Sequence, residues 1–240
     1  MTLNKSACLS VVMPAYNEAA YIDTIITQVL AQPEVMQLIV VDDGSTDKTQ
    51  EKILAWKARD ARVEVVIHPV NRGKGAAIRS GLGQVKGAAV VIQDADLEYN
   101  PQDYTALLSP LLKGEADAVY GNRFFEGSSF NGFFHRFGNK TLTMVARVLT
   151  GWPLQDEATC YKMLRTEILN KIELREEGFG FCPEITVKLS RMGARFVELP
   201  IRYNSRTTEE GKKIRLWHGV EALWCLVKYR FQPKSWFLKK

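Results

Sequence analysis

The chain has 240 residues, of which 46% are hydrophobic and 25% are charged. This is the composition of an ordinary globular protein, and it excludes a disordered, collagen-like or low-complexity chain. No apolar stretch of about 18 residues is present, so no membrane-spanning helix is expected. The four cysteines are widely spaced and show no metal-ligand pattern, which favours reduced thiols in a cytosolic protein. The net charge of +5 permits an anionic partner without selecting one.

Short apolar runs alternate with helical segments through the first half of the chain. Strands are predicted at residues 9–13, 38–41, 63–67, 88–92 and 118–120. Helices are predicted around residues 22–30, after a cap at Ser45 or Thr46, at 75–85 and from Pro101. Val and Ile runs without polar alternation indicate strands that are buried on both faces. The alternation of strands and helices therefore predicts an α/β fold with a mostly parallel sheet flanked by helices.

The second half of the chain is less regular. Helices are predicted at residues 141–149, 183–192 and 214–231, and a strand at 195–201. No internal repeat or linker separates the two halves, so we expect one domain over residues 1–240. Its ligand-binding half would span about residues 8–123, and the remainder would span about 124–240.

Polar motifs follow the predicted strands at their carboxyl ends, where ligands bind in open parallel sheets. These motifs are P-A-Y-N-E at 14–18, D-D-G-S at 42–45, N-R-G-K-G at 71–75, D-A-D at 94–96 and G-N-R at 121–123. The sequence therefore predicts a binding site at this edge of the sheet.

Asp94 and Asp96 are two carboxylates that project in the same direction from an extended segment. A hard divalent cation, Mg²⁺ or Mn²⁺, relieves the repulsion between two such groups and shares its remaining positions with substrate phosphates. Glu98 continues the spacing and is the candidate for a third oxygen ligand. The D-x-D pattern is also common in acidic turns, but its position after a buried strand favours the metal.

Other strand-end residues have the chemistry of nucleotide and phosphate ligands. Asp43 can hydrogen-bond a ribose hydroxyl or a base, whereas Asp42 is expected to serve a turn. The segment at 71–75 has the glycines and cations of a phosphate cradle, including Lys74, although it is neither a P-loop nor a dinucleotide motif. Arg123 follows a strand end and is expected to meet phosphate.

Further cations are able to meet phosphate in the same way, although any one of them is more often a solvated surface charge. They are Arg136, Arg206, Lys212 and Lys213.

Together the five motifs resemble the inverting glycosyltransferases of family 2, with the order and spacing of the dolichyl-phosphate mannose synthase branch. The resemblance is dense from Ser10 to Arg123. Beyond that point, Arg206 and Lys212 resemble the closing loop of this branch. The resemblance implies the GT-A type of α/β fold and a nucleotide-sugar donor of the GDP-mannose or UDP-glucose type. It also implies a polyprenyl or dolichyl phosphate acceptor.

The resemblance also implies a role for each matching residue. The nucleotide pocket would be lined by Pro14, Tyr16, Glu18, Val41, Asp43 and Ala95. The metal would be held by Asp94 and Asp96, with Glu98 where a third ligand is usual. Phosphates would be met by Arg123, Arg206 and Lys212. Members often have an Asp followed by Ser-Gly-Phe in the middle region, whereas Asp156 is followed by Glu-Ala-Thr-Cys here.

The expected reaction is direct displacement at the anomeric carbon, in which the metal and cations neutralise the departing nucleoside diphosphate. Asp96 and Arg123 are the catalytic candidates on this side. A hydroxyl acceptor needs a general base, for which Asp156 is the best candidate. A lipid monophosphate needs none, because its second pKa is about 6.

The predicted C-terminal helix carries an apolar stripe at three- and four-residue steps. Its members are Trp217, Val220, Trp224, Val227 and Phe231. With flanking cations, the stripe suits a helix lying in a membrane interface, although such stripes often pack on a core or a second subunit. Aromatic residues around Arg136 would add a second such surface. We therefore expect a peripheral protein on the cytoplasmic face of the membrane.

Two rival classes remain at this point. A nucleic-acid-binding module agrees with the basic charge, but the acidic strand ends would repel a phosphate backbone. A non-catalytic sugar-nucleotide binder would share the donor pocket without turnover. The motifs do not name the sugar, the base, the lipid length or the oligomeric state.

Overall fold

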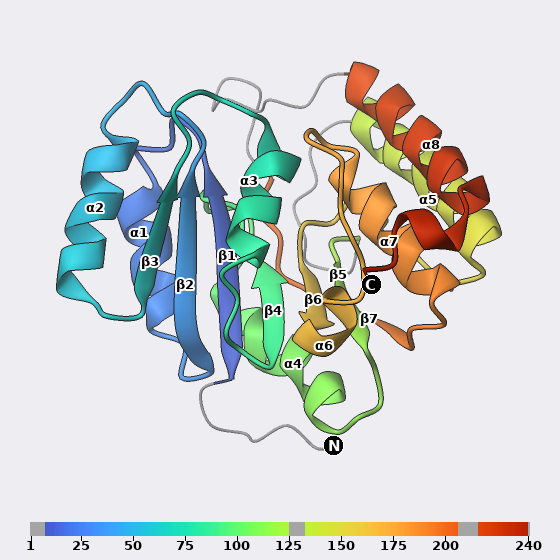
Figure 1. The fold of residues 1–240 in the computed structure, drawn as a ribbon, viewed down its shortest axis with the longest axis horizontal. Coiled ribbons are helices and arrows are strands. Elements are labelled where there is room, and N and C mark those ends of the chain that lie inside the picture. The colour runs from blue at the N-terminus through green and yellow to red at the C-terminus, as the bar shows by residue number, and fades with distance from the viewer. Residues whose placement is uncertain (1–7, 125–132, 206–215, 240) are drawn as a thin grey trace.

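The computed structural model describes residues 8–124, 133–205 and 216–239, with the side chains of 133–137 and 216 excepted. In this part of the chain, seven strands form a single sheet in the order β3-β2-β1-β4-β6-β5-β7 (Figure 1). The strands are β1 (Leu9–Ala15), β2 (Val35–Asp42), β3 (Val63–Ile67), β4 (Ala89–Ile92), β5 (Ala118–Asn122), β6 (Lys162–Arg165) and β7 (Phe196–Pro200).

The sheet is mostly parallel, as predicted. The pairs β1–β2, β1–β4, β2–β3 and β5–β7 are parallel, whereas β6 runs antiparallel to both β4 and β5. Strand β6 was not predicted, because its four residues K-M-L-R begin and end with a charge. Its position joins the β1–β4 half of the sheet to the β5–β7 half.

Helices cover both faces of the sheet (Figure 1). One face packs against α1 (Ile22–Leu30), α2 (Thr49–Arg59) and α4 (Tyr104–Leu112), the last preceded by the 3₁₀ turn η1 (Pro101–Asp103). The other face packs against α3 (Lys74–Leu82), α5 (Phe133–Thr150), α7 (Phe181–Arg191) and α8 (Leu216–Phe231). The short elements are α6 (Thr166–Leu169) and η2 (Lys234–Trp236).

Strand β1 shows how the local sequence builds the two hydrophobic cores. Val11 and Met13 are buried toward the α1 side, and Val12 is buried toward the α3 side. This alternation follows from the two-residue period of a strand, and it explains why both kinds of position must be apolar. Each fully buried aliphatic side chain contributes about 1.5–3 kcal/mol, so these runs anchor the edge that carries the polar motifs.

Helix α2 begins at Thr49, so the predicted cap at Ser45 or Thr46 is wrong. The Oγ of Ser45 instead accepts a hydrogen bond from the Asn17 amide at 3.0 Å. Asp47 accepts from the Thr49 amide at 2.9 Å, at the start of the helix. Ser45 therefore ties two strand-end loops together instead of capping the helix.

A buried ion pair in α7 fixes the loop at residues 173–180. Lys188 and Glu184 are fully buried and form an ion pair. Glu184 accepts hydrogen bonds from the backbone amides of Arg175 at 2.8 Å and Glu176 at 2.9 Å. A buried carboxylate is stable only when it has such hydrogen-bond partners, so these two bonds hold the loop in place. The loop lies over the start of α3.

No helix among the described residues is both long and apolar enough to span a lipid bilayer.

Candidate active site

One cavity of about 680 Å³ lies at the carboxyl edge of the sheet and brings the strand-end motifs together. Its wall includes most of the predicted nucleotide, metal and phosphate residues. They are Pro14, Tyr16, Glu18, Asp43, Lys74, Asp94, Ala95, Asp96, Glu98 and Arg123. Segments that are far apart in the sequence meet here because parallel strands end at the same edge.

Two of the predicted residues do not line this cavity. Val41 is fully buried in the core between β2 and α3, and it does not line the cavity. Asp156 is also fully buried and outside the cavity lining. The side chains of Arg136, Arg206, Lys212 and Lys213, and of the aromatic residues around Arg136, lie outside the described residues.

Asp43 is a buried carboxylate with several fixed partners. Its Oδ1 lies 2.7 Å from His68 Nδ1 and accepts from the Arg72 amide at 3.0 Å, and its Oδ2 accepts from the Gly73 amide at 2.8 Å. The other nitrogen of His68, Nε2, lies 2.9 Å from Ser80 Oγ. This arrangement gives His68 a role that the sequence did not reveal, because it orients Asp43 at the cavity wall.

The glycines of the N-R-G-K-G segment serve close packing. A Cβ on Gly73 would lie 2.5 Å from the carbonyl oxygen of Glu177, and a Cβ on Gly75 would lie 2.5 Å from that of Glu176. The Ala76 amide donates to the Glu177 carbonyl at 3.1 Å. The amides of residues 72, 73 and 76 are thus used within the protein, and a phosphate-binding role for this segment stays a prediction. Lys74 remains as the cation of this segment in the cavity wall.

Lys74 connects the α3 side of the cavity to the acidic segment. Its Nζ lies 2.5 Å from Asp94 Oδ1 and 3.0 Å from Cys160 Sγ. Burial disfavours the charged ammonium, but the attraction of Asp94 outweighs this effect and raises the pKa of Lys74 well above its usual value. The side chain is therefore charged at neutral pH and neutralises one of the two aspartates.

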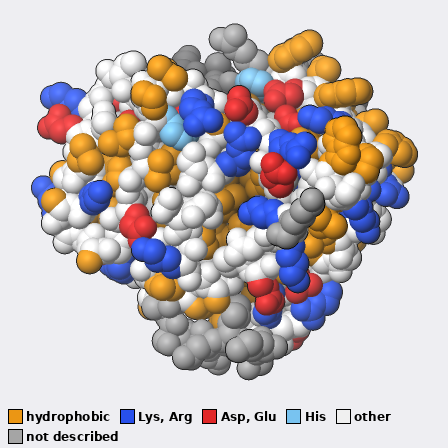
Figure 2. All heavy atoms as spheres, viewed as in Figure 1, with side chains coloured by type: hydrophobic (Ala, Val, Ile, Leu, Met, Phe, Trp, Pro, Cys, Tyr) orange, Lys and Arg blue, Asp and Glu red, His pale blue; other side chains and the backbone are white. Residues whose placement is uncertain are grey.

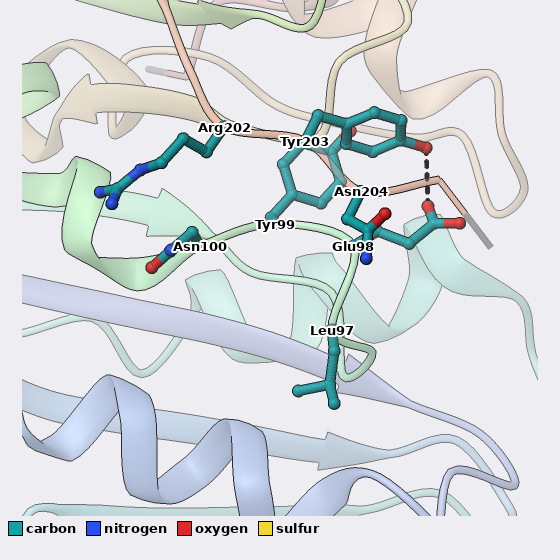
Figure 3. A pocket seen from close by; sticks show the side chains of 7 residues that line it. All are labelled: Leu97, Glu98, Tyr99, Asn100, Arg202, Tyr203 and Asn204. Atoms are coloured by element: carbon teal, nitrogen blue, oxygen red, sulfur yellow. Dashed lines mark hydrogen bonds between the residues drawn. The ribbon is translucent and has the colours of Figure 1, made fainter. Parts of the chain in front are cut away.

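The acidic segment pairs with the segment that follows β7 through an isolated bridge between Tyr99 and Tyr203. Tyr203 donates to Glu98 Oε2 at 2.7 Å (Figure 3). The Asn204 amide donates to the Glu98 carbonyl at 2.9 Å. The Glu98 amide in turn donates to Asp96 Oδ1 at 3.0 Å. A second cavity of about 280 Å³ lies where these segments meet. Glu98 is thus part of a fixed loop, and Tyr203 is a site residue that the motifs did not reveal.

The carboxylate oxygens at this strand end are suitable ligands for a hard divalent cation. Asp94 and Asp96 present carboxylate oxygens at one strand end, and Lys74 already supplies a positive charge to one of them. Within the described ranges, no three Asp, Glu, His or Cys side chains stand together as a metal-binding group. Glu98 as a third ligand therefore stays a prediction, and in this structure its carboxylate accepts from Tyr203.

Arg123 and Asp156 form a buried two-pronged ion pair. Arg123 Nε donates to Oδ2 at 2.7 Å and Nη2 donates to Oδ1 at 2.8 Å, while Asn139 Nδ2 donates to Oδ1 at 3.0 Å. Burial opposes the charge of the guanidinium, but Asp156 outweighs it and raises the pKa of Arg123. The Arg123 guanidinium carbon also lies 5.2 Å from the centre of the Tyr203 ring. Asp156 thus orients the positively charged guanidinium of Arg123 at the cavity wall.

The opposite wall of the cavity is apolar and comes from three helices and the loop before α7. Residues from α5, α7 and α8 line it, namely Leu142, Phe181, Ala222 and Leu223. The rings of Phe179 and His218 lie beside them with centroids 4.3 Å apart. The cavity therefore has an acidic and basic end at the sheet and an apolar end between the helices.

An exposed apolar surface lies on α8 and α5, which pack against each other. The predicted stripe on α8 is confirmed, since Trp217, Val220, Trp224, Val227 and Phe231 are all exposed. Met144 and Val148 of α5 are also exposed, the latter by 80%. Figure 2 shows hydrophobic side chains gathered along the upper right of the molecule, where Figure 1 places these two helices.

The fold and the acidic strand-end site define a glycosyltransferase of the GT-A class. The chain belongs to glycosyl transferase family 2, whose family model matches residues 10–173.

Several curated relatives match most of the length of the chain. The chain is 28% identical to a dolichyl-phosphate beta-glucosyltransferase of Trichomonas vaginalis, covering 93% of this chain and 73% of the relative. It is 27% identical to a dolichol-phosphate mannosyltransferase of Pyrococcus furiosus, covering 85% and 58%. It is 30% identical to a polyprenol monophosphomannose synthase of Mycolicibacterium smegmatis, covering 82% and 77%.

Solved structures support the same fold. Glucosyl-3-phosphoglycerate synthase from Mycobacterium tuberculosis, in complex with Mn²⁺, UDP and glucosyl-3-phosphoglycerate, has a TM-score of 0.71 at 25% identity. That comparison covers 95% of this chain and 82% of the neighbour. The same enzyme with Mg²⁺ and UDP has a TM-score of 0.72 at 26% identity, with coverage of 95% and 81%. These findings confirm the predicted GT-A fold and the glycosyltransferase class.

Proposed function

We propose that this protein transfers a sugar from a nucleotide sugar of the GDP-mannose or UDP-glucose type to a polyprenyl or dolichyl phosphate. One observation carries the proposal. A single cavity joins the carboxylates and cations at the sheet edge to an apolar wall between α5, α7 and α8. A phosphate attached to a long apolar chain matches both ends of this cavity. Three relatives named for dolichyl- or polyprenyl-phosphate sugar transfer support the same acceptor.

On the donor side, Tyr16 and Asp43 would contact the nucleoside, with Pro14, Glu18 and Ala95 completing the pocket. Asp94 and Asp96, with Glu98 as the expected third ligand, would hold Mg²⁺ or Mn²⁺. The cation would supply positive charge to the departing diphosphate. The neighbours with Mn²⁺ or Mg²⁺ and UDP support such a site. Lys74, which is charged beside Asp94, would bind the diphosphate together with the cation.

On the acceptor side, Arg123 would contact the lipid phosphate. Asp156 holds the Arg123 guanidinium in position, and Asn139 donates a hydrogen bond to Asp156. Arg136, Arg206 and Lys212 are proposed to assist. A lipid monophosphate is already anionic, so transfer to it needs no general base. This agrees with an Asp156 whose two oxygens both accept hydrogen bonds. The alternative, a hydroxyl acceptor with Asp156 as base, requires that carboxylate to leave Arg123 and Asn139.

The exposed surface of α5 and α8 would bring the protein to its lipid substrate. Trp side chains and an apolar stripe, with Lys228 and Arg230 in the last turn of α8, suit a helix in the interface of an anionic bilayer. We therefore propose peripheral binding to the cytoplasmic face of the membrane.

A transfer assay tests the function directly. Purified protein would be incubated with Mn²⁺, undecaprenyl or dolichyl phosphate, and radiolabelled UDP- and GDP-sugars. We expect label from one donor to enter the organic phase, and Asp96→Ala to abolish this transfer. Nucleotide-sugar binding without transfer to either lipid would reject the lipid acceptor and favour a hydroxyl acceptor.

A further inference from the structure

Two cysteines face the same cavity from different elements. Cys160 lies just before β6 and Cys182 lies in the first turn of α7, and both line the cavity wall. Cys182 Sγ lies 3.8 Å from the carbonyl oxygen of Thr159, which is the residue before Cys160. The two thiols are therefore neighbours in space although separate elements carry them.

Cys160 is also in contact with the donor side of the site. Its Sγ accepts a hydrogen bond from Lys74 Nζ at 3.0 Å, and the same ammonium lies 2.5 Å from Asp94. A chemical change at the Cys160 sulfur would therefore affect the ion pair between Lys74 and Asp94, which faces the site of the nucleotide-sugar donor. The other two cysteines, Cys8 and Cys225, are buried in the cores and do not line the cavity.

The two thiols differ in acidity. The pKa of Cys182 falls to about 6, first because its thiolate accepts a hydrogen bond from the Cys160 thiol and then because Lys162 and Lys74 attract it, against the effect of burial. The pKa of Cys160 is raised by the same hydrogen bond and by burial. Cys182 is thus the more acidic thiol of the pair. One nucleophilic sulfur beside one protonated thiol is the arrangement of a redox-active pair.

We propose that Cys160 and Cys182 form a reversible intramolecular disulfide that weakens donor binding under oxidising conditions. The inference adds regulation to the donor site and so rests on the proposed function. With hydrogen peroxide as oxidant, the Cys182 thiolate attacks one peroxide oxygen, the O–O bond breaks, and the hydroxide released takes up a proton to become water. The Cys160 thiol loses its proton and its sulfur attacks the Cys182 sulfenic acid, which releases a second water. Overall the two sulfurs give two electrons to the peroxide, one proton comes from the Cys160 thiol and one from solvent, and a dithiol reductant reverses the change.

The new bond would change the cavity in two ways. An S–S bond of about 2.05 Å joins the segment before β6 to α7. It also draws the Cys160 sulfur away from Lys74, so the ammonium loses one of its two partners there and moves toward Asp94. A Lys74 held closer to Asp94 competes with the donor diphosphate and its cation. We expect nucleotide affinity to fall by about tenfold or more, which corresponds to about 1.4 kcal/mol.

The experiment uses the full chain, reduced and then treated with hydrogen peroxide. Peptide mass mapping without reduction reports the cross-link, and calorimetry with UDP and GDP reports donor-site affinity. We expect a Cys160–Cys182 peptide that has lost two hydrogens, weaker nucleotide binding, and recovery of both with dithiothreitol. Cys160→Ala and Cys182→Ala, each compared with itself before and after peroxide, should lose the response. Cys8→Ala and Cys225→Ala should keep it.

Several outcomes would overturn the proposal. Sulfinic acid at Cys182 without a cross-link, or a disulfide that involves Cys8 or Cys225, rejects the pair. A Cys160–Cys182 disulfide with unchanged nucleotide affinity rejects its regulatory role. Both readouts omit the lipid, so a failure of lipid transfer is a separate result. If the reduced chain binds neither UDP nor GDP, the proposed donor site and its proposed regulation are both rejected, whether or not the disulfide forms.

Discussion

Arg123 and Asp156 are held together by two side-chain hydrogen bonds of 2.7 and 2.8 Å, with the Asp156 side chain fully buried. The pair joins the end of β5 to the segment before β6. Because such paired geometry orients a guanidinium as well as neutralising it, Asp156 decides where the Arg123 charge points.

Asp156→Asn therefore tests whether this residue positions Arg123 or acts as a base. An amide can keep one of the two hydrogen bonds, so we expect transfer to fall by about tenfold, with a higher KM for the acceptor lipid. Loss of a general base would instead cost about 10²–10⁴-fold in kcat. Steady-state kinetics with varied lipid phosphate separates the two. Asp117→Asn, which weakens the paired bonds to the exposed Arg195, is the matched control and should leave transfer unchanged.

His68→Ala should weaken nucleotide binding. The substitution removes the imidazole that lies 2.7 Å from Asp43, and hydrogen bonds to charged groups contribute about 1.5–3 kcal/mol. We expect a 10- to 100-fold rise in the Kd for the preferred nucleotide, measured by calorimetry. Ser80→Ala removes only the partner on the far side of the ring and should have a smaller effect. Equal losses in both variants would contradict the proposed role of His68.

Gly75→Ala should destabilise the fold by about 1–3 kcal/mol, because its Cβ would lie 2.5 Å from the Glu176 carbonyl oxygen. The loop at 173–180 cannot retreat freely, since Glu184 holds it by two backbone amides. Urea denaturation measures the loss in free energy of unfolding. Gly83→Ala meets only ordinary contacts of 3.5 Å or more and is the control. Equal free energies of unfolding for the two variants would show instead that the loop moves to accommodate the added methyl group.

Glu157 should make stability depend on pH. Burial raises the pKa of its carboxyl from 4.5 to about 8, against the attraction of Lys162. The folded protein therefore keeps a proton that the unfolded chain releases above pH 4.5. This contribution to stability is complete below pH 4.5 and is lost as the pH rises to 8, at about 1.4 kcal/mol per pH unit.

Glu157→Gln stays neutral at every pH and should remove that slope. Free energies of unfolding from urea titrations at about pH 5.5 and pH 7.5 should differ less for the variant than for the parent chain. The variant should gain most, relative to the parent, at the higher pH. Parallel slopes in the two proteins would mean that Glu157 is charged in the folded state.

Trp224→Ala should weaken binding to anionic vesicles. Trp224 is 65% exposed in the stripe on α8, so little core packing is lost with it. We expect at least a fivefold lower partition coefficient in vesicle sedimentation, because an interfacial Trp contributes on the order of 1 kcal/mol or more. Leu54→Ala, an exposed apolar residue of α2 on the other side of the sheet, should bind like the parent chain. Equal binding of all three proteins would assign the α8 surface to another contact.

The sequence alone predicted the features that depend on a local pattern of residue types. Uninterrupted Val and Ile runs identified the parallel strands, and the four buried residues of α1 follow the predicted helical face. The meeting of Asp43, Asp94 and Arg123 at one cavity also followed, because parallel strands end at a common edge. The exposed stripe from Trp217 to Phe231 was visible as a helical period.

Tertiary structure decided what depends on partners that are distant in the chain. The insertion of β6 between β4 and β5 requires strand pairing that its four residues do not signal. The bonds of Asp156 to Arg123 and of His68 to Asp43 join residues on separate elements. The glycines at 73 and 75 also allow the close approach of the loop at 176–178, a contact that the local sequence does not signal. The sequence gives the type of each side chain, but the packing of the whole chain decides its partners. The reason is that burial and hydrogen bonding act between neighbours in space.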